Sequence, residues 1–187
     1  MTKVVASSKV YQLKVTLKDS KPPIWRRFQV RSDITFAKLH RIIQEVMGWF
    51  DGHLHQFIVG RIYYGVPDPD DLSEMRDERK VRLDQILSMP GRKIVYEYDF
   101  GDGWEHEIVL EKILSPDPKT RYPRCLDGAR ACPPEDCGGI YGYADFLEAI
   151  RDPNHEEHEE MLEWIGGEFD PEEFDLQDIN ISLKSIR

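Results

Sequence analysis

The stretch "KIVYEYDFGDGWEHEIVLEKIL", Lys93 to Leu114, contains two alternating runs joined by Gly101-Asp102-Gly103. Two such runs separated by glycine and aspartate predict a β-hairpin. With a three-residue loop, Tyr98 pairs with His106, and one face of the hairpin is almost wholly aromatic or apolar. A two-residue Asp-Gly loop is the alternative, and it mixes charged and apolar side chains on one face. In either register the stretch predicts a half-buried antiparallel pair.

The same stretch contains Asp-Phe-Gly, the tripeptide that holds magnesium in protein kinases. A kinase also needs a glycine-rich phosphate loop and a His-Arg-Asp catalytic loop, and neither is present in this sequence. The sequence also lacks a Walker loop, a Rossmann fingerprint and a Ser-His-Asp order. These absences exclude kinases and the common nucleotide-binding and serine-hydrolase classes.

The segments before the hairpin predict a second pair of strands and a helix. Alternation over Tyr11–Asp19 and Ile24–Val30 indicates two strands joined by a turn at "KPP". The spacing then changes to that of an amphipathic helix from Phe36, which Ser32 or Asp33 would cap and Gly48 would end. One helix therefore follows the first hairpin.

The remaining segments complete an α+β pattern. Residues 53–65 read as a strand or a bent pair of strands, and residues 81–91 as a short helix. A long Pro, Gly and Cys-rich loop is expected over 115–139, and a helical part over 140–175. We expect a mostly antiparallel sheet with helices at the C-terminus, folded as one domain over residues 1–187.

Charge is distributed unevenly along the chain. The net charge is −10, yet residues 1–60 balance to +6 and residues 116–187 to −11. A chain with this net charge is expected to bind double-stranded nucleic acid poorly without sequence specificity, because the phosphates repel it. Its basic first third could still bind a nucleic acid. No apolar run of about 18 residues or secretory h-region is found, which predicts a cytoplasmic protein that does not span a membrane. Three cysteines argue against a disulfide framework.

Five stretches together resemble one protein family along nearly the whole chain. They are "PPIWRRFQV", "FAKLHRIIQEVMGWFDGHLHQF", "YEYDFGDGWEH", "PRCLDGARACPPEDCGGIYGYADFLEAI" and "DPNHEEHEEMLEWIGGEFDPEEFD". The chain resembles the plasmid pRi ORF-three-like family. The resemblance implies a stand-alone α+β domain of bacteria and archaea, often linked to mobile elements, and it implies no particular reaction.

Two segments dense in Asp, His and Trp are candidates for a shared pocket. Buried polar groups of this kind are costly unless they are paired. We therefore expect "WFDGHLHQF" and the hairpin turn to converge, with the cysteine loop across them as a lid. The alternative is that each segment satisfies its own turn. The candidate pocket residues are Trp49, Asp51, His53, His55, Asp99, Asp102, Trp104 and His106.

Two sets of residues in the sequence could bind zinc or another divalent metal. His53 and His55 would point to the same side of a strand, and His106 or a nearby aspartate could add a ligand. Cys125, Cys132 and Cys137 form the second set, to which Glu135 or Asp136 could add a ligand, although their spacing departs from a zinc knuckle. The alternatives are a polar network around the histidines and packed thiols in a proline-rich loop.

Two functional classes follow from these observations. No complete catalytic set is visible, which favours a binding or adaptor module for a protein or nucleic acid. The family resemblance implies that such a module is accessory to mobile elements. The alternative is a metal-dependent hydrolase or nuclease using His53, His55, His106 and the nearby aspartates. Whether the chain is an enzyme is left open by the sequence.

Overall fold

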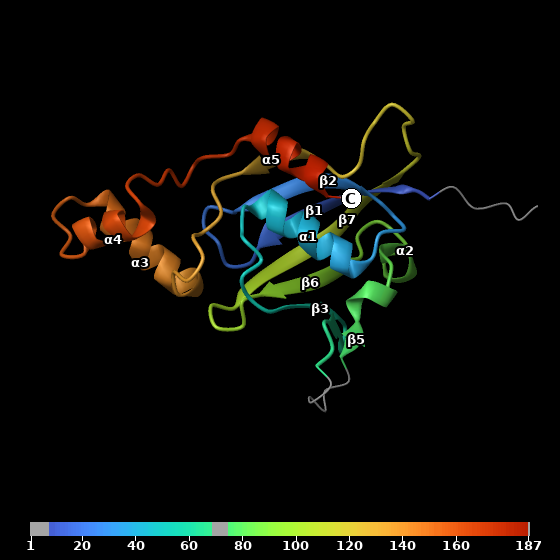
Figure 1. The fold of residues 1–187 in the computed structure, drawn as a ribbon, viewed down its shortest axis with the longest axis horizontal. Coiled ribbons are helices and arrows are strands. Elements are labelled where there is room, and N and C mark those ends of the chain that lie inside the picture. The colour runs from blue at the N-terminus through green and yellow to red at the C-terminus, as the bar shows by residue number, and fades with distance from the viewer. Residues whose placement is uncertain (1–7, 69–74, 187) are drawn as a thin grey trace, which may run out of the picture.

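The computed structural model describes residues 8–68 and 75–186. Within them, eight strands form one sheet in the order β5-β4-β3-β6-β7-β1-β2-β8, antiparallel except for β4 and β5. The strands are β1 (Val10–Leu17), β2 (Trp25–Arg31), β3 (His55–Val59), β4 (Ile62–Gly65), β5 (Arg76–Asp77), β6 (Lys93–Tyr98), β7 (Trp104–Leu114) and β8 (Arg124–Ala129). The helices are α1 (Phe36–Met47), α2 (Leu83–Ile86), α3 (Gly139–Arg151), α4 (His158–Ile165) and α5 (Leu176–Ser182), with 3-10 turns at Glu78–Lys80 and Leu183–Ser185. The expected α+β class is confirmed (Figure 1).

The first hairpin and helix form as the sequence predicted, apart from the helix cap. β1 pairs with β2, and the alternating apolar residues of both strands face the core with α1. Thr35 caps α1 by accepting a hydrogen bond from the Lys38 amide, so the expected cap at Ser32 or Asp33 is wrong. The chain leaves the strand over a further short turn before the helix begins. Gly48 ends α1 in a left-handed conformation, as expected.

The β6–β7 hairpin forms in a different register from the one favoured by the sequence. Tyr98 pairs with Trp104 and Tyr96 with His106, a shift of two residues that keeps the aromatic face intact. Asp99 causes the shift, because it has a φ of 55° and its Oδ1 accepts the Gly101 amide at 2.9 Å. The turn therefore takes five residues instead of three or two.

Like charges on the outer face of this hairpin are separated by cations and amides. Glu97 lies opposite Glu105 in the register, an unfavourable pairing if left alone. Glu105 forms an ion pair with Lys18, and the Glu97 carboxylate accepts a hydrogen bond from Gln56 at 2.6 Å. The acidic face of the hairpin is thereby held by side chains of its neighbouring strands.

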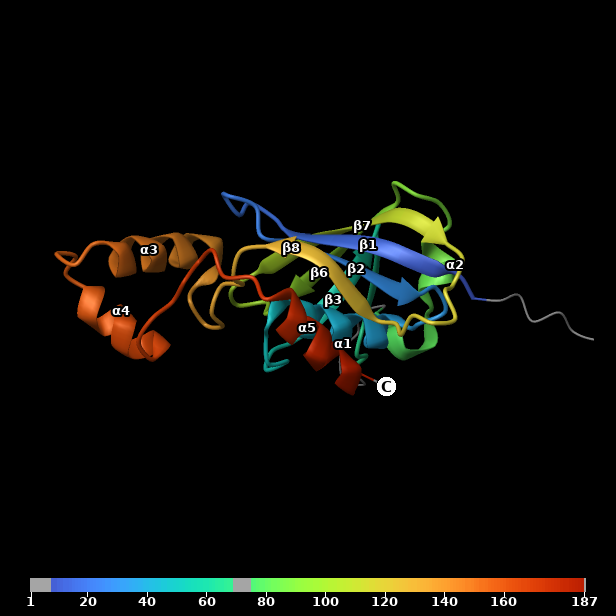
Figure 2. The same ribbon diagram turned by 90° about the horizontal axis from the view of Figure 1, so that it is seen from above.

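The C-terminal half differs from the sequence expectation in two places. The expected 115–139 loop contains β8, which pairs with β2 at the edge of the sheet. Helical structure also continues past residue 175, because α5 covers Leu176–Ser182 and lies with α1 on one face of the sheet (Figure 2). α3 and α4 form an arm that extends beyond the sheet (Figures 1 and 2). No helix in the described part of the chain is long and apolar enough to cross a bilayer.

One side chain joins α5 to the edge strand β8. Asn180 Oδ1 accepts the Cys125 amide at 2.9 Å, and its Nδ2 donates to the Cys125 carbonyl at 3.0 Å. These bonds take the place of the ladder partners that β8 would have if another strand followed. We expect Asn180→Ala to lower the free energy of unfolding by about 1–3 kcal/mol, because two backbone groups lose their partners. Urea unfolding measures the change. The neighbouring Ile181→Ala, whose side chain is exposed, should alter stability much less, and equal losses would contradict this role.

Candidate functional site

His53 lies in the loop between α1 and β3, with a carboxylate on either side of its ring. Its Nδ1 is 3.6 Å from Asp99 Oδ2, and its Nε2 is 3.3 Å from Asp136 Oδ1 and 3.9 Å from Glu135 Oε2. Asp99 comes from the β6–β7 turn, and the other two come from the cysteine-rich loop before α3. Three segments that are distant in sequence therefore meet at one imidazole.

In Glu135 and in Asp99, one carboxylate oxygen accepts hydrogen bonds that hold the side chain in place, and the other oxygen faces His53. Glu135 Oε1 accepts hydrogen bonds from the Phe50 amide and the Tyr98 hydroxyl, both at 2.8 Å. Burial first, and then this hydrogen bond, raises the pKa of Tyr98 far above its usual range, so its hydroxyl remains a donor. Asp99 Oδ1 closes the hairpin turn, leaving Oδ2 for the imidazole.

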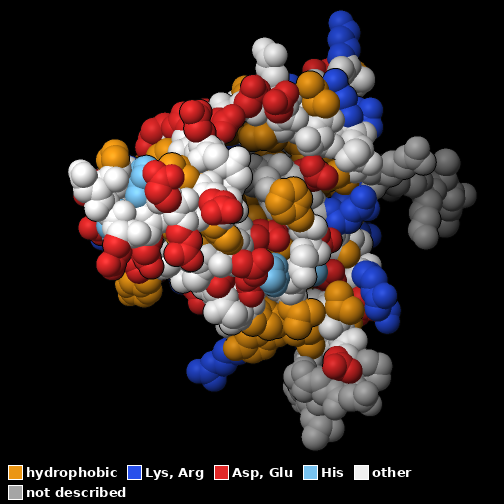
Figure 3. Space-filling view, turned by 60° about the vertical axis from the view of Figure 1, so that its left-hand side comes forward, with side chains coloured by type: hydrophobic (Ala, Val, Ile, Leu, Met, Phe, Trp, Pro, Cys, Tyr) orange, Lys and Arg blue, Asp and Glu red, His pale blue; other side chains and the backbone are white. Residues whose placement is uncertain are grey.

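The surroundings of His53 carry a negative charge that no basic side chain balances. Within residues 8–68 and 75–186, Asp99, Glu135 and Asp136 form ion pairs with His53 but with no Lys or Arg. Like charges this close disfavour one another unless a cation lies between them. Figure 3 shows many Asp and Glu side chains, with histidine side chains among them, on the face that it presents. We call His53, Asp99, Glu135 and Asp136 the His53 site.

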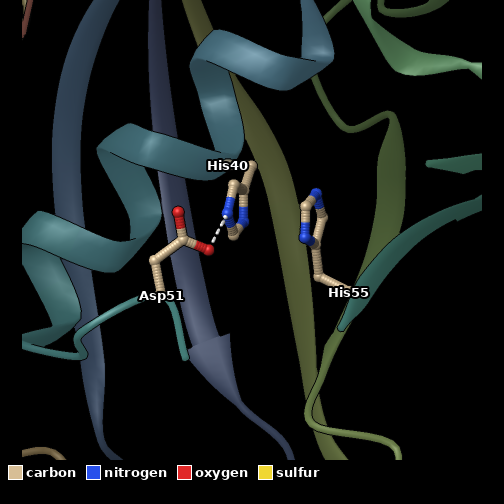
Figure 4. A group of neighbouring side chains, drawn as sticks. All are labelled: His40, Asp51 and His55. Atoms are coloured by element: carbon tan, nitrogen blue, oxygen red, sulfur yellow. Dashed lines mark hydrogen bonds and ion pairs between the residues drawn. The ribbon is translucent and has the colours of Figure 1, made fainter. Parts of the chain in front are cut away.

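A second cluster lies deeper, where His40 of α1 stacks on His55 of β3. The two rings are 3.4 Å apart and almost parallel, and His40 Nε2 is bonded to Asp51 Oδ1 at 2.7 Å (Figure 4). His40 Nδ1 lies 2.8 Å from the Tyr96 hydroxyl, which also accepts from Gln44. Gln44 Oε1 in turn accepts the Asp51 amide.

These contacts close a ring of hydrogen bonds around a neutral His40. The Tyr96 hydroxyl donates to Nδ1, and Nε2–H donates to the carboxylate of Asp51. Burial, and next the neighbouring His55, lower the pKa of His40, which agrees with a neutral ring. His55 is itself bonded to the buried Glu78 at 2.9 Å. Because its polar atoms are mutually paired, this cluster reads as a polar network that orients α1 against the sheet.

The expected pocket residues are thus divided among several surroundings. His53 and Asp99 meet, whereas Asp51 and His55 belong to the deeper network. Asp102 accepts the Gly138 amide at 3.2 Å, which ties the hairpin turn to the start of α3. His106 and Trp104 are fully buried, and Trp49 stands edge-on to His106 at 5.1 Å. The cysteine-rich loop does lie over Trp49, whose Nε1 donates to the Pro133 carbonyl.

The three cysteines are not gathered into a ligand set. In the described residues, the groups that could hold a metal are His40, Asp51 and His55, and His53, Asp99 and Asp136, and neither contains a cysteine. Burial raises the pKa of all three thiols, that of Cys137 to about 12.

Sequence reasoning missed two kinds of residue at these sites. No motif in the sequence marks the first kind, because its members come from three separate elements. They are His40 from a helix, Tyr96 from a central strand and Glu78 from a 3-10 turn. Glu135 and Asp136 were noted only as additions to a cysteine site. Two adjacent carboxylates before "CGG" indicate a candidate polar site in this loop. The sequence does not indicate that they meet His53, because His53 is about 80 positions away in the chain.

Comparison with known proteins gives consistent matches. The family described as "Plasmid pRiA4b ORF-3-like protein" matches residues 9–178. The uncharacterized protein y4hQ of Sinorhizobium fredii is 42% identical over 158 residues, covering 84% of this chain and 81% of that protein. The crystal structure of the protein of unknown function MM3350 from Methanosarcina mazei Go1 has a TM-score of 0.84 and 41% identity, covering 92% of this chain and 98% of that one.

The buried His106 makes stability depend on pH. Burial lowers the pKa of His106 to about 4 from 6.5. Between these values the unfolded chain binds a proton that the folded chain does not, so stability falls as the pH drops below about 6.5. We expect His106 to contribute about 2 kcal/mol of lost stability between pH 7 and pH 5.

Urea unfolding at the two pH values measures this contribution. His106→Leu should make the difference between pH 7 and pH 5 smaller than in the unmodified chain. His155→Gln, in the exposed loop before α4, should leave the difference unchanged. An equal pH dependence in the unmodified chain and His106→Leu would contradict the assignment.

Proposed function

This chain belongs to the plasmid pRiA4b ORF-3-like protein family, and we propose that it is a binding module organised around a divalent cation at the His53 site. The family resemblance read from the sequence is confirmed by the match over residues 9–178. The observation that carries the proposal is the convergence of three carboxylates on one imidazole with no Lys or Arg paired to them in the described residues.

The carboxylates around His53 suit different roles. His53, Asp99 and Asp136 would supply the direct ligands, because one ligand atom of each lies within 4.8 Å of the others. Glu135 Oε2, 3.9 Å from His53 Nε2, would be an outer contact. Two ligand atoms each about 2.1 Å from a metal lie about 3.0–3.4 Å apart. The 3.3 Å between His53 Nε2 and Asp136 Oδ1 falls within that range.

One imidazole with two carboxylates favours a borderline cation such as Zn²⁺ or Mn²⁺ over Ca²⁺, which takes oxygen ligands alone. Three protein ligands leave coordination positions open. Asp136 is also 71% exposed, so a partner can approach from solvent. An oxygen of a protein carboxylate or a nucleic-acid phosphate could complete the coordination, which is how a bound cation would serve a binding module.

A metal-dependent hydrolase or nuclease is the second candidate, and it would use the same cation. His53 would be its one histidine ligand, because His55 is paired with Glu78 and His106 is buried beneath Trp49. Hydrolysis of a simple phosphodiester, bis(p-nitrophenyl) phosphate, by Mn²⁺-loaded protein tests this candidate. Turnover that disappears in His53→Gln would support it, and cation binding without turnover would leave the binding module.

The cation itself is tested by calorimetric titration of untagged protein with Zn²⁺ and Mn²⁺. We expect one site. Loading should raise the free energy of unfolding by about 2.7 kcal/mol when the free cation is 100 times its dissociation constant, and the unfolding temperature should rise with it. Asp136→Asn and His53→Gln should each weaken binding by at least tenfold, because each removes a direct ligand.

Two further variants discriminate the His53 site from other histidines. Glu135→Gln should weaken binding less than Asp136→Asn does, since it changes only the outer contact. His155→Gln is the matched control and should bind as the unmodified chain does. Stoichiometric binding that survives His53→Gln, or no binding to the unmodified chain, would contradict the proposal.

A further inference from the structure

A groove runs between α3 and α4 in the arm that extends beyond the sheet. Its volume is about 320 Å³. Phe146, Met161 and Trp164 give it apolar walls, and Asp136, Asp145 and Glu157 bring carboxylates to it. Asp136 is shared with the His53 site, so the groove opens beside that site.

The apolar walls of the groove are only partly covered by the chain itself. Phe146 of α3 is buried and packs edge-on against the Trp164 ring, with centroids 5.6 Å apart. Trp164 nevertheless remains 45% exposed, and no residue of α4 is buried. A large aromatic side chain left half exposed on a paired helix offers area that a partner can cover.

The charge of the arm selects the kind of partner. Residues 135–175 contain fifteen Asp or Glu residues and one basic residue, Arg151. Arg151 lines a separate cavity with Lys21 and Arg130. Among the described residues, no Lys or Arg pairs with Asp136, Asp145 or Glu157, and Asp136 faces His53. The groove therefore presents carboxylates without a Lys or Arg partner beside its apolar walls.

We propose that this groove docks a Lys/Arg-rich segment of a partner protein. The methylene stems of Lys and Arg pack against apolar side chains while their charged ends reach the surrounding carboxylates. A guanidinium over the exposed Trp164 ring adds a cation–π contact. Nucleic acid and anionic membranes carry the same sign of charge as the arm, so they are repelled where a basic segment is attracted. The groove and the His53 site are separate binding sites that share only Asp136.

The probe is a fluorescein-labelled twelve-residue peptide in which Arg and Leu alternate, measured by fluorescence anisotropy in the presence of EDTA. EDTA separates this result from that of the cation site. The decisive comparison is between two double variants that remove the same charge from the same arm. Asp145→Asn with Glu157→Gln changes the groove. Glu159→Gln with Glu163→Gln changes exposed carboxylates of α4 that do not line it.

We expect the groove pair of substitutions to weaken peptide binding about fivefold to tenfold, and the control pair less than threefold. Trp164→Ala should weaken binding at unchanged charge. Because this variant also removes the contact between Trp164 and Phe146, its helix content is compared with that of the unmodified chain. The two charge variants decide the question by themselves. Amide chemical-shift changes on titration should be confined to α3, α4 and the loop before α3.

Each of the following results would overturn the proposal. The two double variants could lose affinity equally, which would show attraction by the net charge alone. The unmodified chain could fail to bind the Arg-Leu peptide, or bind an alternating Glu-Leu peptide as well. A single-stranded oligonucleotide or phosphatidylserine vesicles could bind more tightly than the Arg-Leu peptide, which would assign the arm to another class of partner.

Discussion

The carboxylate of Glu135 joins three parts of the chain that the sequence keeps far apart. One oxygen accepts the amide of Phe50, just after α1, and the hydroxyl of Tyr98, at the end of β6. The loop that carries Glu135 is thereby fixed over the end of the sheet, with Trp49 bonded to Pro133 beside it. Because one oxygen is used in this way, the other remains directed at His53. The same contacts thus set the position of the loop and the chemistry of the site.

The two histidine clusters differ in whether their polar atoms find partners within the chain. Around His40, each donor meets an acceptor, through Asp51, Tyr96 and Gln44. Such a closed ring gains nothing from a ligand and stabilises the packing of α1 on the sheet. Around His53, carboxylates face one ring at 3.3–3.9 Å without a hydrogen bond to it. Negative charge at this spacing that no Lys or Arg of the described residues balances is what separates a candidate cation site from a structural network.

Sequence patterns predicted the faces of the elements better than their ends. Alternation in β1, β2, β6 and β7 placed the right side chains in the core, since a shift of two residues leaves a face unchanged. The β6–β7 register and the cap of α1 depended on single side chains, Asp99 and Thr35, and several nearby residues could have filled each role. His53 and Asp99 were predicted as neighbours because both follow regular elements. Glu135 and Asp136 reach them only through the path of a long loop, which no periodicity encodes.

The position of a bound cation tests the account most directly. Crystals soaked in Zn²⁺ or Mn²⁺ and measured at the absorption edge of the metal reveal the cation by its anomalous scattering. We expect one strong peak about 2.0–2.2 Å from a ring nitrogen of His53 and from oxygens of Asp99 and Asp136, with Glu135 as an outer contact. A peak between His40 and His55 instead, or no peak at the His53 site, would contradict it.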